Sequence, residues 1–192
     1  SRINSALFAK IAAQVLAANN IKVYLYDALR PVPLLSFGVR FYKAFAGIMI
    51  TASHNPKEYN GYKVYGPDGA QLSLEPAQQV LNYINALDYF NNPLADFEKA
   101  ASEGLIELVG KDVDDAYLKE ILALVSNHEL INSQADSLKI VYTPLHGTGL
   151  VPIMNMYKAL GLSKVELVKA QTEPDGAFPT TASPNPENLE AL

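Results

Sequence analysis

The chain alternates short apolar runs with longer amphipathic segments, and this pattern limits its fold more than any other feature of the sequence. Runs of β-branched, aromatic and aliphatic residues predict strands at 21–26, 46–51, 62–65, 105–109, 138–142 and 164–168. Apolar positions three and four apart predict helices at 3–18, 33–43, 75–90, 112–125 and 151–160, with a weaker helix ending near residue 102. Strands that alternate with helices of this length predict an α/β fold with helices on both faces of the sheets.

Two of these elements carry more specific expectations. The first helix has apolar residues four positions apart, which predicts one apolar stripe formed by Ile3, Leu7, Ile11 and Val15. The unbroken apolar run 46–51 is typical of a strand that is buried on both faces.

Composition excludes several classes of function. The 192 residues carry a formal net charge of −5, and lysine and arginine do not cluster among aromatic residues, so we expect no nucleic-acid partner. The absence of cysteine excludes disulfides, thiolate nucleophiles and cysteine-ligated zinc. The longest apolar runs fall far short of the roughly 20 residues of a membrane span. We therefore expect a soluble, cytoplasmic protein with no membrane partner.

The length predicts one large or two small domains. Gly110 is the candidate boundary, which gives domains at 1–110 and 111–192. The chain begins on a helical pattern without an initiator methionine, and residues 190–192 resemble the first turn of another helix. We therefore expect an excerpt of a longer protein.

The segment 47–56, GIMITASHNP, carries the most information about chemistry. A strand that ends in a loop of small polar residues presents the hydroxyl of Ser53 at the carboxyl end of a sheet, where open α/β folds bind ligands. Thr51 and Ala52 are also small, so a phosphate could approach the backbone N–H groups. The alternative is an ordinary Asn-Pro turn with a surface serine, and the spacing alone does not exclude it.

Lys63 lies in the next predicted strand and could bind phosphate or act as an acid or base, although a single lysine is more often a solvated surface group. His54 follows Ser53 directly, and we expect that a neighbouring histidine does not fold back to serve as its base. The local sequence also lacks the Gly-x-Ser-x-Gly pattern, which disfavours an esterase. Pro152 stands where a dinucleotide fingerprint would have its third glycine, so we expect no nucleotide cofactor.

Four segments together resemble the α-D-phosphohexomutase family, in its bacterial phosphoglucomutase/phosphomannomutase branch. They are TASHNPKEYNGYKVYGPDGAQL at 51–72, RPVP at 30–33, YTPLHGTG at 142–149 and EPDGAFPTTASPNPE at 173–187. They span nearly the whole chain in the family's order. The resemblance implies three-layer α/β/α domains with mixed sheets, here most of domain I, without its first strand, and the first part of domain II.

The same resemblance implies the reaction and the roles of individual residues. A phosphorylated Ser53 would exchange its phosphoryl group with a hexose phosphate through a hexose 1,6-bisphosphate, which interconverts hexose 1-phosphate and hexose 6-phosphate. A phosphoryl oxygen on Ser53 would ligate Mg²⁺. Arg2 would be an active-site cation, Lys63 an acid/base or phosphate contact, and His54 a positioning or electrostatic group. His146 would support the structure more than the chemistry.

Mg²⁺ and glucose 1,6-bisphosphate are the implied cofactor and activator. The resemblance places the carboxylate metal ligands and the other sugar- and phosphate-binding domains outside this sequence, so we expect the 192 residues alone to be inactive. Alternatives are a phosphoglucosamine mutase and a catalytically silent sugar-phosphate-binding relative. The sequence specifies neither the preferred hexose phosphate nor the oligomeric state.

Overall fold

The computed structural model describes residues 2–181, 184–185, 187 and 189, so the helix start expected at 190–192 lies outside the described residues. The chain forms two compact units. Unit A comprises residues 4–51 and 61–110, and unit B comprises residues 1–3, 52–60 and 111–192. The loop 52–60 therefore groups with the carboxyl-terminal part of the chain, although both strands that it connects belong to unit A.

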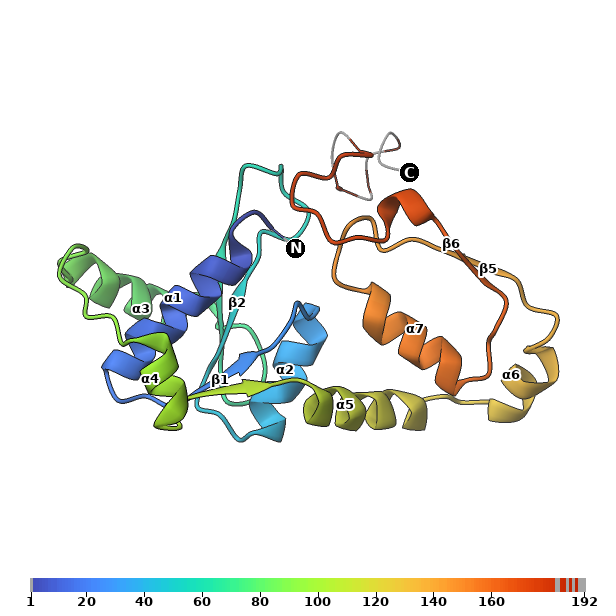
Figure 1. The fold of residues 1–192 in the computed structure, drawn as a ribbon, viewed down its shortest axis with the longest axis horizontal. Helices are drawn as coiled ribbons and strands as arrows, with labels where there is room; N and C mark the ends of the chain where they lie inside the picture. Colours follow the sequence, from blue (N-terminus) through green and yellow to red (C-terminus); the bar gives the residue numbers. More distant parts are fainter. Residues whose placement is uncertain (1, 182–183, 186, 188, 190–192) are drawn as a thin grey trace. The chain divides into compact units, whose positions relative to one another are not determined.

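Unit A contains the first eight elements of the chain (Figure 1). In order they are α1 (Ser5–Ala18), β1 (Val23–Tyr26), α2 (Val32–Phe41), β2 (Gly47–Ile50), β3 (Tyr62–Tyr65), α3 (Leu74–Ala86), α4 (Phe97–Ser102) and β4 (Ile106–Val109). Strand β1 pairs with β4 in parallel, and β2 pairs with β3 in antiparallel orientation. Helix α1 contacts β1, β2 and β4, and α2 contacts β2.

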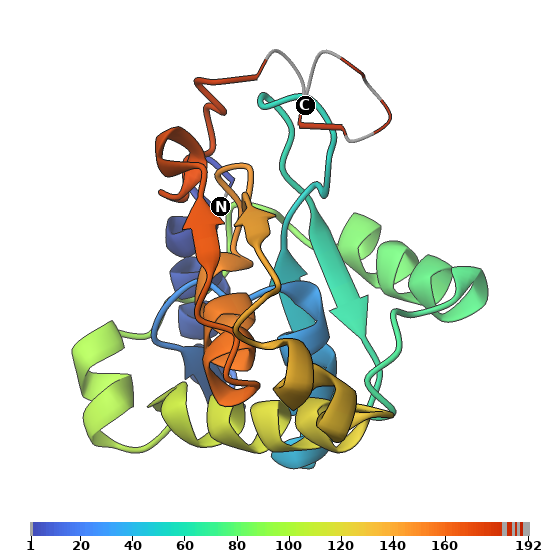
Figure 2. The same cartoon turned by 90° about the vertical axis from the view of Figure 1, so that its right-hand side faces the viewer.

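Unit B contains the remaining elements (Figure 2). They are α5 (Lys111–Ala123), α6 (His128–Gln134), β5 (Ile140–Tyr142), α7 (Leu150–Ala159), β6 (Val165–Leu167) and the 3₁₀ turn η1 (Lys169–Gln171). Strands β5 and β6 are parallel, and α7 lies between this pair and α5. Parallel and antiparallel pairs together confirm the predicted mixed α/β class.

Helix α6 was not predicted from the sequence, although its start has a recognisable cap. The side chain of Asn127 accepts a hydrogen bond from the backbone N–H of Leu130 at 2.8 Å. Such a cap satisfies one of the N–H groups that a helix start leaves without an intrahelical partner. The seven residues of α6 are too few to show a helical period, so only the cap could have indicated the helix.

One cluster in the core of unit A contains two small residues of α1. Ala13 and Ala17 are buried together with Ala100 of α4 and Ile106 of β4. The first three members of the predicted stripe, at positions 3, 7 and 11, are exposed, so the buried face of α1 is a different one. Alanines allow the helix backbone to approach the strands closely, which larger side chains on that face would prevent.

Two further expectations about elements were wrong. The helix predicted at 75–90 ends at Ala86, because the carboxylate of Asp88 accepts the backbone N–H of Phe90 at 3.0 Å and forms a turn there. In β2 only Gly47 is buried, and the other three residues are half-buried. The pair β2–β3 is a two-stranded sheet, so β2 does not reach the double-sided burial of a strand inside a wide parallel sheet.

No helix among the described residues is both long and apolar enough to cross a membrane.

Strand β4 offers a test of the core of unit A, because two of its residues differ sharply in burial. Ile106 is 2% exposed and Leu108 is 59% exposed. We expect Ile106→Ala to lower the free energy of unfolding by about 2–5 kcal/mol, since it removes buried methyl groups and leaves a cavity. Leu108→Ala should change it by about 0.5 kcal/mol or less. Urea unfolding followed by far-ultraviolet circular dichroism measures both, and equal losses would contradict the described core.

Candidate functional site

Ser53 lies in the loop that connects β2 and β3, and two tight turns shape this loop. The backbone N–H of Asn55 donates to the carbonyl of Ala52 at 3.1 Å, and that of Tyr59 donates to the carbonyl of Pro56 at 3.0 Å. Ser53 itself has a φ of 56°, in the left-handed region that non-glycine residues rarely adopt. Its side chain is exposed, whereas the preceding Ala52 is buried. The loop thus holds a serine hydroxyl in solvent on a constrained backbone.

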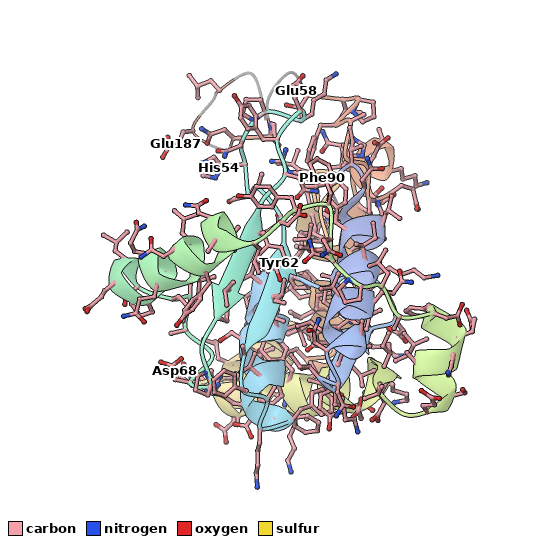
Figure 3. All side chains as sticks on the ribbon, turned by 90° about the vertical axis from the view of Figure 1, so that its left-hand side faces the viewer. His54, Glu58, Tyr62, Asp68, Phe90 and Glu187 are labelled. Atoms are coloured by element: carbon pink, nitrogen blue, oxygen red, sulfur yellow. The ribbon has the colours of Figure 1, made fainter. Side chains whose placement is uncertain are left out.

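His54 contacts the hydroxyl of Ser53, contrary to the expectation from the sequence. Nδ1 of His54 lies 3.2 Å from Oγ of Ser53. The left-handed backbone at Ser53 accounts for the contact, because it turns the chain so that consecutive side chains do not diverge as they do in a strand. Figure 3 shows His54 and Glu58 on this loop. His54 is therefore in position to influence the charge or the proton of the hydroxyl.

Arg2 holds the same loop although it lies some fifty residues earlier in the sequence. Its guanidinium donates hydrogen bonds to the carbonyls of Ser53 at 2.6 Å, Asn55 at 2.6 Å and Pro56 at 2.9 Å. The residue is 5% exposed, and this burial lowers the pKa of Arg2 from its ordinary value. An arginine nevertheless stays charged at neutral pH.

A second hydrogen bond joins the same two segments. The side-chain amide of Asn60 donates to the carbonyl of Ile3 at 3.1 Å. The amino-terminal residues therefore hold the loop near both of its ends, at Ser53 and at Asn60.

Lys63 lies on β3 in unit A, paired in register with Met49 of β2. Its side chain is half-buried, and the neighbouring Tyr62 and Val64 point to the other face of the strand pair. Of the four predicted site residues, the structure brings Arg2, Ser53 and His54 together in unit B. The role of Lys63 stays a prediction.

Phe178 was not predicted as a site residue, yet its ring covers Arg2. The guanidinium carbon of Arg2 lies 5.2 Å from the centre of the Phe178 ring, within the range of a cation–π contact. Gly176 lies beside the same segment, since a Cβ there would come within 2.5 Å of the backbone nitrogen of Ile3. The sequence Asp-Gly-Ala-Phe indicates a turn, but nothing in it indicates which cation the phenylalanine would cover.

His146 is buried and joins two loops of unit B. Its Nδ1 donates to the carbonyl of Glu173 at 3.0 Å, and its Nε2 is paired with the hydroxyl of Thr180 at 2.9 Å. Gln171 extends the network, since its amide donates to Thr180 at 3.1 Å and its carbonyl oxygen accepts from the hydroxyl of Thr143 at 2.6 Å. These contacts support the predicted structural role, because they hold the segment after β6 against the loop after β5.

The described residues do not fit a magnesium site. Mg²⁺ favours six oxygen ligands in octahedral geometry, with one or two carboxylates among them. Within the part of the chain that the structure describes, no three histidine, aspartate or glutamate side chains gather to hold a metal ion. The hydroxyl of Ser53 supplies a single oxygen.

Fold and site together define a mixed α/β protein with an exposed serine hydroxyl on a loop whose carbonyls bind a buried guanidinium. Comparison with known proteins agrees with this description. The family model for phosphoglucomutase/phosphomannomutase, alpha/beta/alpha domain I, matches residues 1–90, and that for domain II matches residues 115–192. The chain therefore belongs to the phosphoglucomutase/phosphomannomutase family.

Individual curated relatives of this chain are phosphoglucomutases. A phosphoglucomutase of Staphylococcus epidermidis is 45% identical over 188 residues, which are 96% of this chain and 33% of the relative. A phosphoglucomutase of Staphylococcus haemolyticus is 46% identical over 192 residues, which are 98% of this chain and again 33% of the relative. The chain thus spans about a third of the length of these curated relatives.

A solved structure shows the same fold. It is a crystal structure from Thermus thermophilus, provisionally named a phosphomannomutase, with a TM-score of 0.71 at 28% identity. The match covers 96% of this chain and 38% of the chain in that crystal structure.

The three bonds of Arg2 yield a prediction about the loop. Arg2→Lys keeps the charge but replaces a planar guanidinium with a single ammonium, which cannot reach three separate carbonyls equally well. We expect backbone amides in residues 52–60 to exchange with deuterium about tenfold faster, since hydrogen bonds to charged groups are strong and their loss favours local opening. Exposed Arg40 on α2 provides the control, and Arg40→Lys should leave that exchange unchanged. Equal exchange in all three proteins would show that Arg2 does not hold the loop.

Proposed function

We propose that the protein containing this chain is a phosphohexomutase that interconverts hexose 1-phosphate and hexose 6-phosphate. Ser53 carries the phosphoryl group between the two positions, and a hexose 1,6-bisphosphate is the intermediate. The observation that carries the proposal is the exposed hydroxyl of Ser53 on a left-handed loop residue, with its own carbonyl bound by Arg2 at 2.6 Å. Such a loop keeps the hydroxyl accessible while restricting its position, as in-line phosphoryl transfer requires.

The reaction consists of two transfers. In the first, a free hydroxyl of the hexose phosphate attacks phosphorus on phosphorylated Ser53, so that a sugar O–P bond forms while the Oγ–P bond breaks. The sugar hydroxyl loses its proton to a base, and Oγ gains one. In the second, Oγ attacks the other phosphate of the bisphosphate, its proton leaves, and the released sugar oxygen is protonated.

Residues of this chain supply the groups for these steps in our proposal. Lys63 serves as the acid or base, or contacts a phosphate. His54, whose Nδ1 lies 3.2 Å from Oγ of Ser53, stabilises the charge that develops at Oγ. Arg2 adds positive charge beside the loop and fixes three of its carbonyls. Preorganised charge of this kind is the main protein contribution to phosphoryl transfer.

Mg²⁺ and glucose 1,6-bisphosphate remain the proposed cofactor and activator, on the strength of family membership alone. A cytoplasmic location is likewise a proposal. Since the chain spans about a third of its curated relatives, the proposed activity is that of the protein expressed from the complete gene. Assays with glucose 1-phosphate, mannose 1-phosphate and glucosamine 1-phosphate distinguish a phosphoglucomutase/phosphomannomutase from a phosphoglucosamine mutase.

The carrier role of Ser53 is tested directly by mass spectrometry. After incubation of that complete protein with glucose 1,6-bisphosphate and Mg²⁺, we expect one phosphoryl group on the peptide that contains Ser53. Ser53→Ala should remove both this label and turnover, because no hydroxyl remains to form the ester. Ser73, which is exposed before α3, provides the matched control, and Ser73→Ala should keep the label and turnover.

Two outcomes would overturn the proposal. Turnover that persists in Ser53→Ala would exclude Ser53 as the carrier. A protein that binds sugar phosphates but never acquires the label, with or without Mg²⁺, would instead be the catalytically silent relative.

A further inference from the structure

Phe178 has a backbone conformation that is unfavourable for a residue with a bulky side chain. Its φ is 50°, in the left-handed region, where a bulky side chain is strained and stays only when its surroundings impose the conformation. The residue is only 7% exposed. A strained, buried aromatic residue indicates that the surrounding structure holds its ring in one particular place.

The neighbouring turn shows what holds Phe178. The carboxylate of Asp175 accepts the backbone N–H of Ala177 at 2.8 Å, and the carbonyl of Phe178 accepts the N–H of Thr181 at 3.1 Å. The backbone N–H of Asp175 in turn donates to the carbonyl of buried His146 at 3.1 Å. The turn is therefore fixed on both sides of Phe178 and anchored to the loop after β5.

The ring of Phe178 lies over the guanidinium of Arg2, at 5.2 Å from the guanidinium carbon to the ring centre. An aromatic face attracts a cation and excludes water from one side of it, so the guanidinium is restrained in position and orientation. Its N–H groups are directed at the carbonyls of Ser53, Asn55 and Pro56. A displaced guanidinium would change the donors available to these carbonyls, and the backbone of Ser53 would lose its restraint.

We propose that Phe178 is a positioning residue for phosphoryl transfer at Ser53, acting through Arg2. The ring fixes the position of the guanidinium, and the guanidinium fixes the positions of three loop carbonyls. The loop backbone in turn determines the direction of the Ser53 hydroxyl. The proposal rests on the carrier role of Ser53 proposed above. It predicts that Phe178 affects the rate of transfer and leaves the affinity for the phosphoryl donor unchanged.

The test compares Phe178→Leu with Phe178→Tyr in the complete protein. Both variants keep a bulky side chain at the same strained φ, but only tyrosine keeps the aromatic face. Phe178 also lines an open cavity of about 430 Å³, beside Lys57 and Thr180. Two quantities are measured, the single-turnover rate of Ser53 phosphorylation by glucose 1,6-bisphosphate and the deuterium exchange of residues 52–60.

We expect Phe178→Leu to slow phosphorylation about tenfold at saturating bisphosphate, with an unchanged KM, and to speed exchange in residues 52–60. Phe178→Tyr should restore both values to within about twofold of the unmodified protein. Exchange in β1 and β4 of unit A should be the same in all three, since a general loss of stability would raise it there as well.

Gly176→Ala provides a second variant that leaves the ring intact. The added Cβ would come within 2.5 Å of the nitrogen of Ile3 and 2.9 Å of the carbonyl carbon of Arg2, so it must push the segment that carries the guanidinium. We expect the same two changes as in Phe178→Leu.

Each result decides the proposal. A Phe178→Leu protein with normal phosphorylation and normal exchange in 52–60 would overturn it, as would a Phe178→Tyr protein as slow as Phe178→Leu. If the unmodified protein is never phosphorylated, the carrier role of Ser53 fails, and with it the part of the inference that concerns catalysis. The exchange of residues 52–60 then still shows whether Phe178 holds the loop.

Discussion

Three carbonyl groups of one loop converge on the guanidinium of Arg2, and the rest of the site depends on this interaction. Turns in a loop leave several backbone acceptors without a partner in a helix or sheet, and a side-chain donor can bind them. A guanidinium is the one side chain that offers five N–H donors in a single plane. It therefore adds three hydrogen bonds to those of the loop's own two turns, and it joins residues 53–56 to the second residue of the chain.

The local elements of this fold were largely predictable, because their determinants are local. The strand at 62–65 was predicted with its observed bounds, and Pro33 lies in the first turn of α2 as its fixed φ favours. The incorrect predictions concern places where a side chain bonds to the backbone, or where tertiary packing determines which face of a helix is buried. A side-chain hydrogen bond of Asp88 forms a turn just after the end of α3, and the buried face of α1 carries alanines instead of the larger apolar side chains.

The site was predictable in part, for a similar reason. The segment 47–56 indicated Ser53 because a strand followed by small polar residues is a local pattern. The contact between Ser53 and His54 depends on a backbone angle that the sequence does not state, and the contact between Arg2 and Phe178 joins residues near the two ends of the chain. A prediction from spacing alone cannot anticipate either of them. The resemblance to a family could place Arg2 near Ser53, but it did not specify that the guanidinium binds the loop's own carbonyls.

The choice of partners for Arg2 has an electrostatic consequence. A carboxylate would hold the guanidinium as firmly as these acceptors do, but it would also cancel its charge. The carbonyls of Ser53, Asn55 and Pro56 are neutral, and the aromatic face of Phe178 is neutral as well. These four contacts fix Arg2 in place without neutralising it, and burial strengthens its field, because little water remains to screen the charge. The same set of contacts that shapes the loop can therefore keep a full positive charge next to Ser53, where a transferring phosphoryl group would carry negative charge.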